Sequence, residues 1–270
     1  MNRLKFKLNQ ALKVGEYSIP YDAELTNQEN QIAGSGIRKE SKLRSFIKTV
    51  LYPVYSLRNY LLVDGFVERK TGKLIKKYIR DNTVFLEVGC GNMSLRRFLP
   101  RNLFYNAIDI SLSEFILRRI LREGERINVA LCSATRISLD SSTVSLIVST
   151  EVLEHIPAID IALSDIYRVL KPEGILIVSI PNNYCYKYHK KGPHSEHVNN
   201  WTFYEFKEYM NQHGFKCLEG CMMGYWIPLP LWLTKTSYQL PISSKEEFYN
   251  TNFFFVFQKP KKELSSRNSG

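Results

Sequence analysis

The sequence of 270 residues lacks several features that define whole classes of protein. It has no uninterrupted run of about 18 apolar residues, which excludes a membrane-spanning helix. Its basic first residues carry no apolar stretch of signal-peptide length, so secretion is not expected. With 14 glycines and 11 prolines, it is neither collagen-like nor of low complexity. The five scattered cysteines are too few for a disulfide framework and predict a reducing, cytoplasmic location.

The positive charge is concentrated in the first third of the chain. The net charge is +11, and residues 1–80 hold 16 Lys or Arg against 7 Asp or Glu, a balance of +9 that leaves +2 for the rest. This asymmetry predicts an anionic partner: nucleic acid, a lipid surface or a phosphorylated substrate. The alternative is a solvated basic face without a partner. Charge alone does not decide between nucleic acid and membrane.

Composition shifts along the chain predict three parts. Residues 1–65 form a basic N-terminal arm, irregular over 1–40 and ending in a basic amphipathic helix over 42–62. That helix either lies peripherally in a membrane interface or packs on the neighbouring domain. Residues 66–258 form the main domain, and residues 259–270 form a flexible tail.

The main domain alternates between strand and helix periodicity. The pattern predicts strands over 83–88, 104–109, 128–132, 144–149, 174–180, 215–220 and 252–258. It predicts helices over 67–79, 93–100, 112–122, 159–170 and 202–213. Alternation at this spacing is typical of an α/β domain with a mainly parallel sheet.

The run FLEVGCGN at residues 85–92 places two glycines directly after an apolar strand. Glycine lets the backbone turn sharply and lets a ligand approach closely. A dinucleotide fingerprint needs a third glycine where this chain has Ser94, and Glu87 would repel a diphosphate but not a cationic sulfonium. Asp109 ends the next strand, where an acid can accept hydrogen bonds from both ribose hydroxyls or, alternatively, can charge a helix N-terminus. These residues disfavour a nicotinamide-dependent reductase.

These motifs resemble the class I S-adenosylmethionine-dependent methyltransferases of the small-molecule type, whose pattern is E-x-G-x-G followed by D-x-S. Later runs continue the resemblance, namely ALCSATRISLDSSTVSLIVSTEVLEHI (130–156) and IYRVLKPEGILIVSIPN (166–182), so that it covers about residues 75–258. It implies a Rossmann-like fold of seven mainly parallel strands with helices on both faces and an antiparallel last strand, to which the N-terminal helix is an extension. It also implies S-adenosylmethionine as cofactor, bound by Glu87, Gly89, Cys90, Gly91, Asp109, Ile110, Ser133, Ala134 and Thr150.

Two positions depart from the family pattern. Ser133 stands where the family usually has an acid near the adenine, and Ser145 replaces a frequent aspartate before the fourth strand. The first departure puts one adenine hydrogen bond in doubt, although the Ser133 hydroxyl or the backbone can supply it. The second is a structural difference of small effect.

An acid–acid–histidine run follows the strand at 144–149. If a helical turn starts there, Glu151, Glu154 and His155 share one face. With His197, and with His194 nearby, they could hold Mg²⁺ or Mn²⁺, and the run resembles the metal-binding element of ubiquinone-pathway O-methyltransferases and of small-RNA 3′-end methyltransferases. The alternatives are His155 as a general base without metal, with Glu151 as its catalytic companion, or a purely structural histidine.

Two unusual segments bear on the substrate, namely the basic N-terminal arm and an apolar insert over 222–251. Together they predict an anionic acceptor, small or lipid-linked, with the insert lining an apolar pocket, resting on a membrane or merely covering the sheet. The expected reaction is O-methylation by in-line methyl transfer. The alternatives are RNA methylation and a catalytically inactive, cofactor-binding partner protein.

Overall fold

The computed structural model describes residues 3–8, 10–14, 17–21, 65–111, 120, 126–192, 194–227, 238–240 and 242–261. The predicted amphipathic helix over 42–62 and nearly all of the predicted helix over 112–122 lie outside these residues, as does most of the predicted tail. Among the helices that are described, none has the length and apolar character needed to cross a bilayer.

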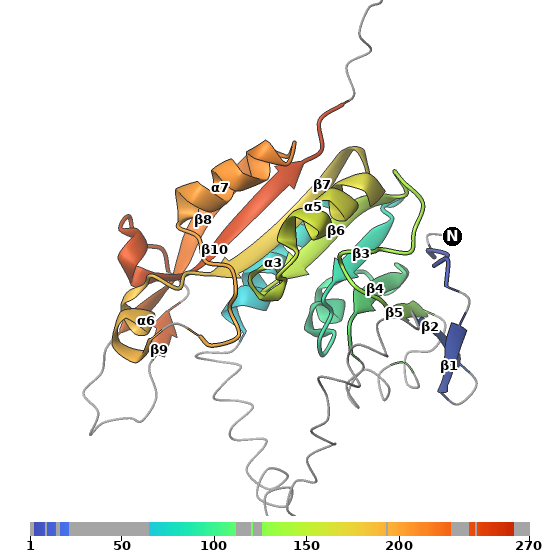
Figure 1. Cartoon of the computed structure of the whole chain (residues 1–270), viewed down its shortest axis with the longest axis horizontal. Helices are drawn as coiled ribbons and strands as arrows, with labels where there is room; N and C mark the ends of the chain where they lie inside the picture. Colours follow the sequence, from blue (N-terminus) through green and yellow to red (C-terminus); the bar gives the residue numbers. More distant parts are fainter. Residues whose placement is uncertain are drawn as a thin grey trace, which may run out of the picture.

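A single mixed sheet forms the centre of the molecule (Figure 1). Its order is β1-β2-β5-β4-β3-β6-β7-β10-β8-β9, and the five strands from β5 to β7 are parallel. β10 runs antiparallel to both of its neighbours. The strands span Gln10–Val14 (β1), Tyr17–Tyr21 (β2), Phe85–Val88 (β3), Tyr105–Asp109 (β4), Ile127–Leu131 (β5), Val144–Thr150 (β6), Leu170–Pro181 (β7), Lys216–Ile227 (β8), Tyr238–Leu240 (β9) and Asn250–Gln258 (β10).

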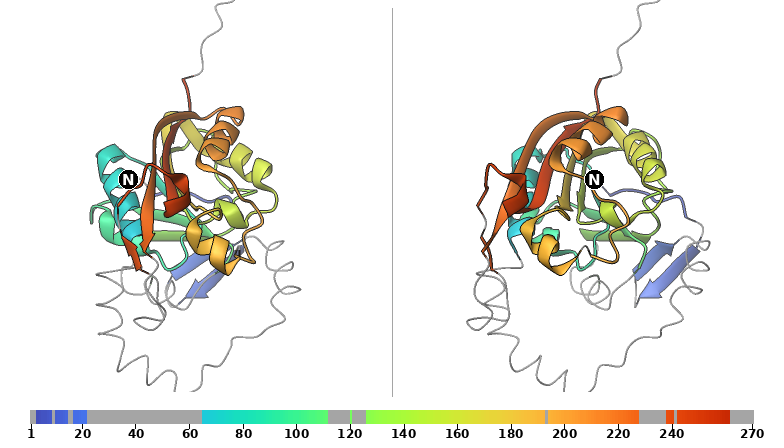
Figure 2. Two further views of the ribbon diagram at one scale, coloured as in Figure 1. Left: turned by 90° about the vertical axis from the view of Figure 1, so that its left-hand side faces the viewer. Right: turned by 60° about the vertical axis from the view of Figure 1, so that its left-hand side comes forward.

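Helices cover both faces of this sheet (Figure 2). α3 (Phe66–Tyr78) and the 3-10 helix η1 (Ser94–Phe98) pack on one face, where they share an apolar core with β3, β4 and β5. α5 (Ile159–Val169) and α7 (Phe203–Gln212) pack on the other face in a second core. The predicted Rossmann-like class is confirmed. Its seven strands lie in the order β5-β4-β3-β6-β7-β10-β8, and β10, the last of them in the chain, is antiparallel to its neighbours.

Helix boundaries follow from local chemistry in the sequence. α7 begins with a capping box in which Thr202 accepts from the Glu205 backbone N–H and Glu205 accepts from that of Thr202. α5 buries one stripe, including Leu163 and Ile166, as its period of three and four predicts. The helix predicted over 93–100 is the shorter η1, which starts after Met93 in a left-handed conformation.

The prediction of an irregular arm over residues 1–40 is wrong for its described part. β1 and β2 form an antiparallel hairpin, and β2 joins the sheet beside β5. Before the hairpin, the Leu4 backbone donates to Asn106 Oδ1 at 2.9 Å and accepts from Asn128 Nδ2 at 2.9 Å. Two buried asparagines on β4 and β5 therefore tie the start of the chain to the domain, a contact that no local pattern in residues 1–40 reveals.

Two further elements differ from expectation. β8 extends to Ile227 rather than ending near residue 220, so the first part of the predicted insert over 222–251 belongs to the sheet, and β9 pairs with it. The segment around His189, for which the sequence pattern predicts no helix, contains the short helix α6 (Tyr186–Lys191). Its Tyr186 and His189 rings contact the Phe248 ring in the 3-10 helix η4 (Glu247–Tyr249), a contact between segments far apart in the sequence.

Candidate active site

The site is a cavity of about 820 Å³ at the carboxyl ends of the parallel strands. It lies where the strand order reverses between β3 and β6, the position at which open α/β sheets bind ligands. All the residues predicted to bind the cofactor line this one cavity, namely Glu87, Gly89, Cys90, Gly91, Asp109, Ile110, Ser133, Ala134 and Thr150. The predicted catalytic residues Glu151 and His155 line it as well.

The glycine bend after β3 is built for close approach of a ligand. Gly89 has φ +73°, and a Cβ at this position would lie 2.3 Å from Val152 Cγ2, so a side chain is excluded by conformation and by contact. Gly91 has φ +47°, yet nothing lies within 4 Å of its Cβ position. The open side of Gly91 faces the cavity that it lines, which leaves backbone within reach of a ligand.

Asp109, at the end of β4, joins two loops of the site. Its Oδ2 accepts the Gly91 backbone N–H at 2.8 Å and its Oδ1 accepts that of Ser111 at 3.1 Å. A carboxylate has about four acceptor positions, so both oxygens retain capacity for a diol. The role predicted from sequence, contact with both ribose hydroxyls, is compatible with this geometry.

The approach to the bend carries a buried negative charge. The Glu87 side chain is 3% exposed and accepts a hydrogen bond from the Tyr105 hydroxyl on β4. Burial first, and then the charges of Glu87 and Asp109, raise the pKa of the Cys90 thiol between the two glycines. Cys90 therefore stays a protonated, space-filling residue, while the acids favour a cationic ligand.

Two hydroxyl side chains line the cavity. The Ser133 hydroxyl is 2.8 Å from that of Thr135 and accepts the Thr135 backbone N–H at 3.1 Å. The Thr150 hydroxyl is buried and has no hydrogen-bond partner within the described part of the chain. A buried orphan hydroxyl at a cavity wall is costly unless a ligand or water satisfies it.

Glu151 departs from the predicted arrangement. It has φ +54°, and the 3-10 helix η3 (Leu153–His155) starts only after it, so it does not share a helical face with Glu154 and His155. Instead its carboxylate accepts from Ser179 Oγ at 2.8 Å and from Asn252 Nδ2 at 2.9 Å. The predicted four-residue metal set therefore loses Glu151, which is held toward β7 and β10 at the edge of the cavity.

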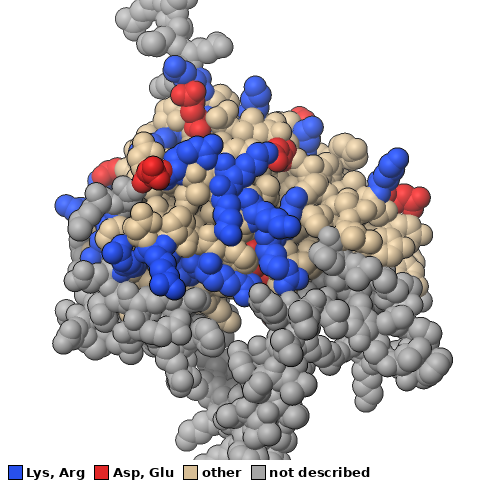
Figure 3. Space-filling model, turned by 180° about the vertical axis from the view of Figure 1, so that it is seen from behind, with Lys and Arg blue, Asp and Glu red and all other residues tan. Residues whose placement is uncertain are grey.

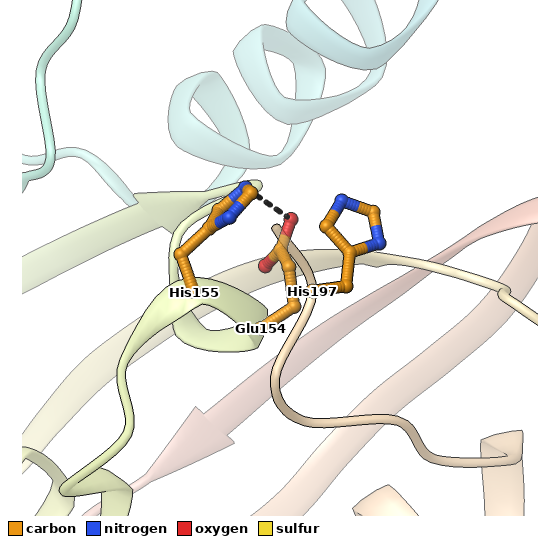
Figure 4. A group of neighbouring side chains, drawn as sticks. All are labelled: Glu154, His155 and His197. Carbon is orange, nitrogen blue, oxygen red and sulfur yellow. Dashed lines mark ion pairs between the residues drawn. The ribbon is translucent and has the colours of Figure 1, made fainter. Parts of the chain in front are cut away.

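The other three predicted metal ligands do come together (Figure 4). One ligand atom each from Glu154, His155 and His197 lies within 4.8 Å of the others, and His155 Nε2 is 3.7 Å from Glu154 Oε1. His194 stacks on His197 with 4.6 Å between ring centroids. Among the described residues this is the one group of three or more acids, histidines or cysteines with such spacing.

Backbone and amide contacts bring His197 to η3 from the loop before α7. The backbone N–H groups of Val198 and Asn199 both donate to the Glu154 carbonyl, at 2.9 and 3.0 Å. The Asn199 side chain donates to the carbonyls of Leu153 and Ile156. Hydrogen bonds therefore hold this short polar loop, HVNN in the sequence, against the turn that carries Glu154.

The same loop fixes the orientation of His155. Its Nδ1 lies 2.9 Å from the Glu196 carbonyl oxygen, and since a carbonyl only accepts, Nδ1 carries the hydrogen. In the neutral ring Nε2 is then an acceptor. His155 lines the cavity with 37% of its side chain exposed, so this acceptor is within reach of a bound substrate.

Glu154 is the most unusual ionisable group of the site. Its side chain is 2% exposed, and within the described residues neither carboxylate oxygen has a hydrogen-bond partner. Burial, and next the charge of Glu151, raise its pKa from an ordinary 4.5 to about 9. A bound cation would reverse this cost. One carboxylate with two imidazoles fits Mn²⁺ better than Mg²⁺, which prefers oxygen ligands.

Sequence reasoning missed three parts of the cavity wall. Tyr188 of α6 lines it, and burial, followed by the charges of Cys185, Glu151 and Glu154, raises its pKa to about 12. Phe66, at the start of α3, and Asn252 of β10 line it from the other sides. The aromatic run in α6 was a usable signal for Tyr188, whereas the other two approach through tertiary packing.

Comparison with known proteins identifies a domain in the middle of the chain. Residues 86–178 match the family model for a methyltransferase domain. The chain therefore contains a methyltransferase domain. The prediction made from the E-x-G-x-G and D-x-S pattern is thereby confirmed. A search of curated proteins finds no match to this methyltransferase.

Solved structures share the fold at low sequence identity. A Burkholderia thailandensis 1,6-didemethyltoxoflavin-N1-methyltransferase, which was solved with S-adenosylhomocysteine, is 16% identical, covering 93% of this chain and all of its own with a TM-score of 0.55. An S-adenosylmethionine-dependent methyltransferase from Methanosarcina mazei is 16% identical over 70% of this chain and 98% of its own, with a TM-score of 0.54. The [4+2]-cyclase SpnF matches with 16% identity, 72% and 82% coverage and a TM-score of 0.51.

Removal of the Asp109 carboxylate gives a direct test of the cofactor cavity. We expect Asp109→Ala to weaken S-adenosylmethionine binding by about 1–3 kcal/mol, because a charged hydrogen-bond acceptor is lost and the Gly91 and Ser111 loops are released. The affinity of Asp109→Asn, which keeps one acceptor oxygen, should lie between those of the unmodified chain and Asp109→Ala. Calorimetric titration measures the effect, and unchanged affinity in Asp109→Ala would place the ribose elsewhere.

Proposed function

We propose that this methyltransferase transfers a methyl group from S-adenosylmethionine to an oxygen of an anionic metabolite, small or lipid-linked. The observation that carries the proposal is the oriented His155 ring, which presents an acceptor nitrogen at the wall of the cofactor cavity. An oxygen nucleophile needs such an acceptor because its hydroxyl must lose a proton. The excess of Lys and Arg in residues 1–80 supports an anionic acceptor.

The reaction is an in-line displacement at the sulfonium methyl carbon. The acceptor oxygen forms a bond to that carbon while the carbon–sulfur bond breaks, which leaves S-adenosylhomocysteine as the product. The hydroxyl proton passes to His155 Nε2 and from there to solvent, which the exposed part of the ring can reach. The enzyme otherwise holds the two reactants in line and excludes water.

Two carboxylates support this arrangement. Glu151, held by Ser179 and Asn252, stays in place at the cavity edge without depending on the substrate. Glu87 lies at the glycine bend. Both favour a cofactor with a positive sulfonium and ammonium over a dinucleotide, whose diphosphate they would repel.

A divalent ion, Mn²⁺ rather than Mg²⁺, is the alternative to His155 as the base. Glu154, His155 and His197 would hold it, and the orphaned Glu154 carboxylate is the feature that a cation would satisfy. A bound ion would polarise the acceptor oxygen. His155 Nε2 cannot serve both as ligand and as base, so metal dependence decides between the two roles.

The test is to incubate the enzyme and methyl-labelled S-adenosylmethionine with fractionated cell extract. We expect label in an anionic small-molecule or lipid fraction, on an oxygen of the product. Addition of EDTA should abolish turnover without altering cofactor affinity if the ion is used, and full activity in EDTA would leave His155 as the base. Label confined to RNA, or to nitrogen, would contradict the proposed acceptor.

A further inference from the structure

α3 concentrates the positive charge of the described chain. Residues 66–80 hold six Lys or Arg and one acid, a balance of +5 out of the +9 in residues 1–80. Lys73, Lys76 and Lys77 are exposed on one side of the helix at spacings of three and four, while Leu74 and Ile75 are buried on the opposite side. Arg80 is exposed two residues after the helix ends. The charged side of α3 is therefore one continuous stripe.

η1 extends this stripe sideways. Gly72 of α3 lies so close to η1 that a Cβ there would be 2.4 Å from the Phe98 ring. The Arg97 guanidinium covers the same ring at 4.9 Å. Arg97 and Arg101 are both exposed, and together with the three α3 lysines and Arg80 they form what we call the basic face: Lys73, Lys76, Lys77, Arg80, Arg97 and Arg101.

Acidic side chains neutralise little of the basic face. Lys77 pairs with Glu219 of β8. Lys73 and Lys76 have no ion pair with any residue that the structure describes. Figure 3 shows Lys and Arg gathered across this side of the molecule, with few Asp or Glu among them. Such a patch holds a local positive potential that attracts anions.

The helix that carries most of the basic face starts at the active site. Phe66, Val67 and Glu68 at the start of α3 line the cofactor cavity. From there the helix runs about 20 Å to its end at Tyr78, given a rise of 1.5 Å per residue. A partner that lies along the basic face is therefore adjacent to the cavity opening.

We propose that the basic face binds the surface of an anionic lipid bilayer. Clusters of four to eight basic residues are the size that such surfaces recognise. Nucleic acid fits less well, because the exposed large apolar or aromatic side chains of the described chain all lie outside residues 65–109, so no platform for base stacking accompanies the charges. The sequence just before α3 also predicts a basic amphipathic helix, a pattern of membrane interfaces. This inference concerns attachment and requires no step of methyl transfer.

The experiment measures sedimentation of the full chain with phosphatidylcholine vesicles that contain or lack phosphatidylserine. Lys73→Glu/Lys76→Glu reverses two charges of the basic face. Lys207→Glu/Lys245→Glu reverses two exposed charges on α7 and in the loop before η4 as the matched control. We expect the first variant to bind at least about 30-fold more weakly, since each lost basic residue near the surface costs about fivefold and each added glutamate is repelled, and the control to bind within about threefold of the unmodified chain.

Binding should require phosphatidylserine and should weaken at high salt. The proposal is overturned if the chain does not bind anionic vesicles or if both variants bind them like the unmodified chain. It is also overturned if the chain binds a single-stranded RNA through Lys73 and Lys76 but does not bind vesicles. Cofactor affinity, measured in parallel, is expected to be equal in all three proteins. Failure of attachment is thus distinguishable from failure of the methyltransferase proposal.

Discussion

Replacement of His155 by alanine should lower kcat by about 100- to 10,000-fold, the usual contribution of a positioned general base. The Nε2 atom that accepts the substrate proton is lost, while the glycine bend and Asp109 remain. Affinity for S-adenosylmethionine should change little for the same reason. A single-turnover assay with the labelled acceptor measures the first effect, and calorimetry measures the second.

The control for this variant is His213→Ala. His213 also pairs with an acid, since its Nε2 lies 3.0 Å from Asp160 Oδ1, but it lies at the end of α7 and does not line the cavity. Its loss should leave kcat unchanged. Added imidazole should partly restore His155→Ala, because a diffusible base can occupy the space of the ring. Full activity of His155→Ala would remove the proposed base.

Glu154→Gln should stabilise the metal-free protein at alkaline pH while abolishing metal binding. The native carboxyl keeps its proton to a higher pH than the unfolded chain does, because burial raises its pKa to about 9. Between pH 5 and 8 the native state therefore binds more protons, and stability falls as pH rises by up to about 1.4 kcal/mol per pH unit. Glutamine does not titrate, so this slope should vanish in the variant.

Urea unfolding at several pH values, in chelator-treated buffer, measures the slope. Glu208→Gln on the exposed side of α7 is the matched control and should retain it. Added Mn²⁺ should raise the midpoint of the unmodified protein and not that of Glu154→Gln, since ligands that bind the native state stabilise it. Equal slopes in all three proteins would contradict a Glu154 carboxyl that is buried without a hydrogen-bond partner.

Local patterns in the sequence predict much of the fold because apolar periodicity reflects burial directly. The stripe of Leu163 and Ile166 predicts α5, and Thr202 with Glu205 predicts the start of α7. The N-terminal hairpin escapes such reasoning, because the contacts of Leu4 with Asn106 and Asn128 join residues more than 100 positions apart.

The candidate site likewise has residues that local sequence patterns predict and residues that they do not. The glycine bend and Asp109 are predictable because their function lies in backbone conformation and in the end of a strand. Glu151 is not, since its left-handed backbone breaks the expected helical turn and Ser179 and Asn252 hold its carboxylate elsewhere. His197 was predicted as a ligand, but the hydrogen bonds that Asn199 forms to η3 are visible only in the folded chain.

Calorimetric titration of S-adenosylmethionine into the purified, unmodified chain tests the account most directly. We expect one molecule to bind per chain, S-adenosylhomocysteine to compete and NADH to leave the binding curve unchanged. A titration in which S-adenosylmethionine releases no heat and displaces nothing, or in which NADH occupies the site instead, would contradict the assignment of this cavity.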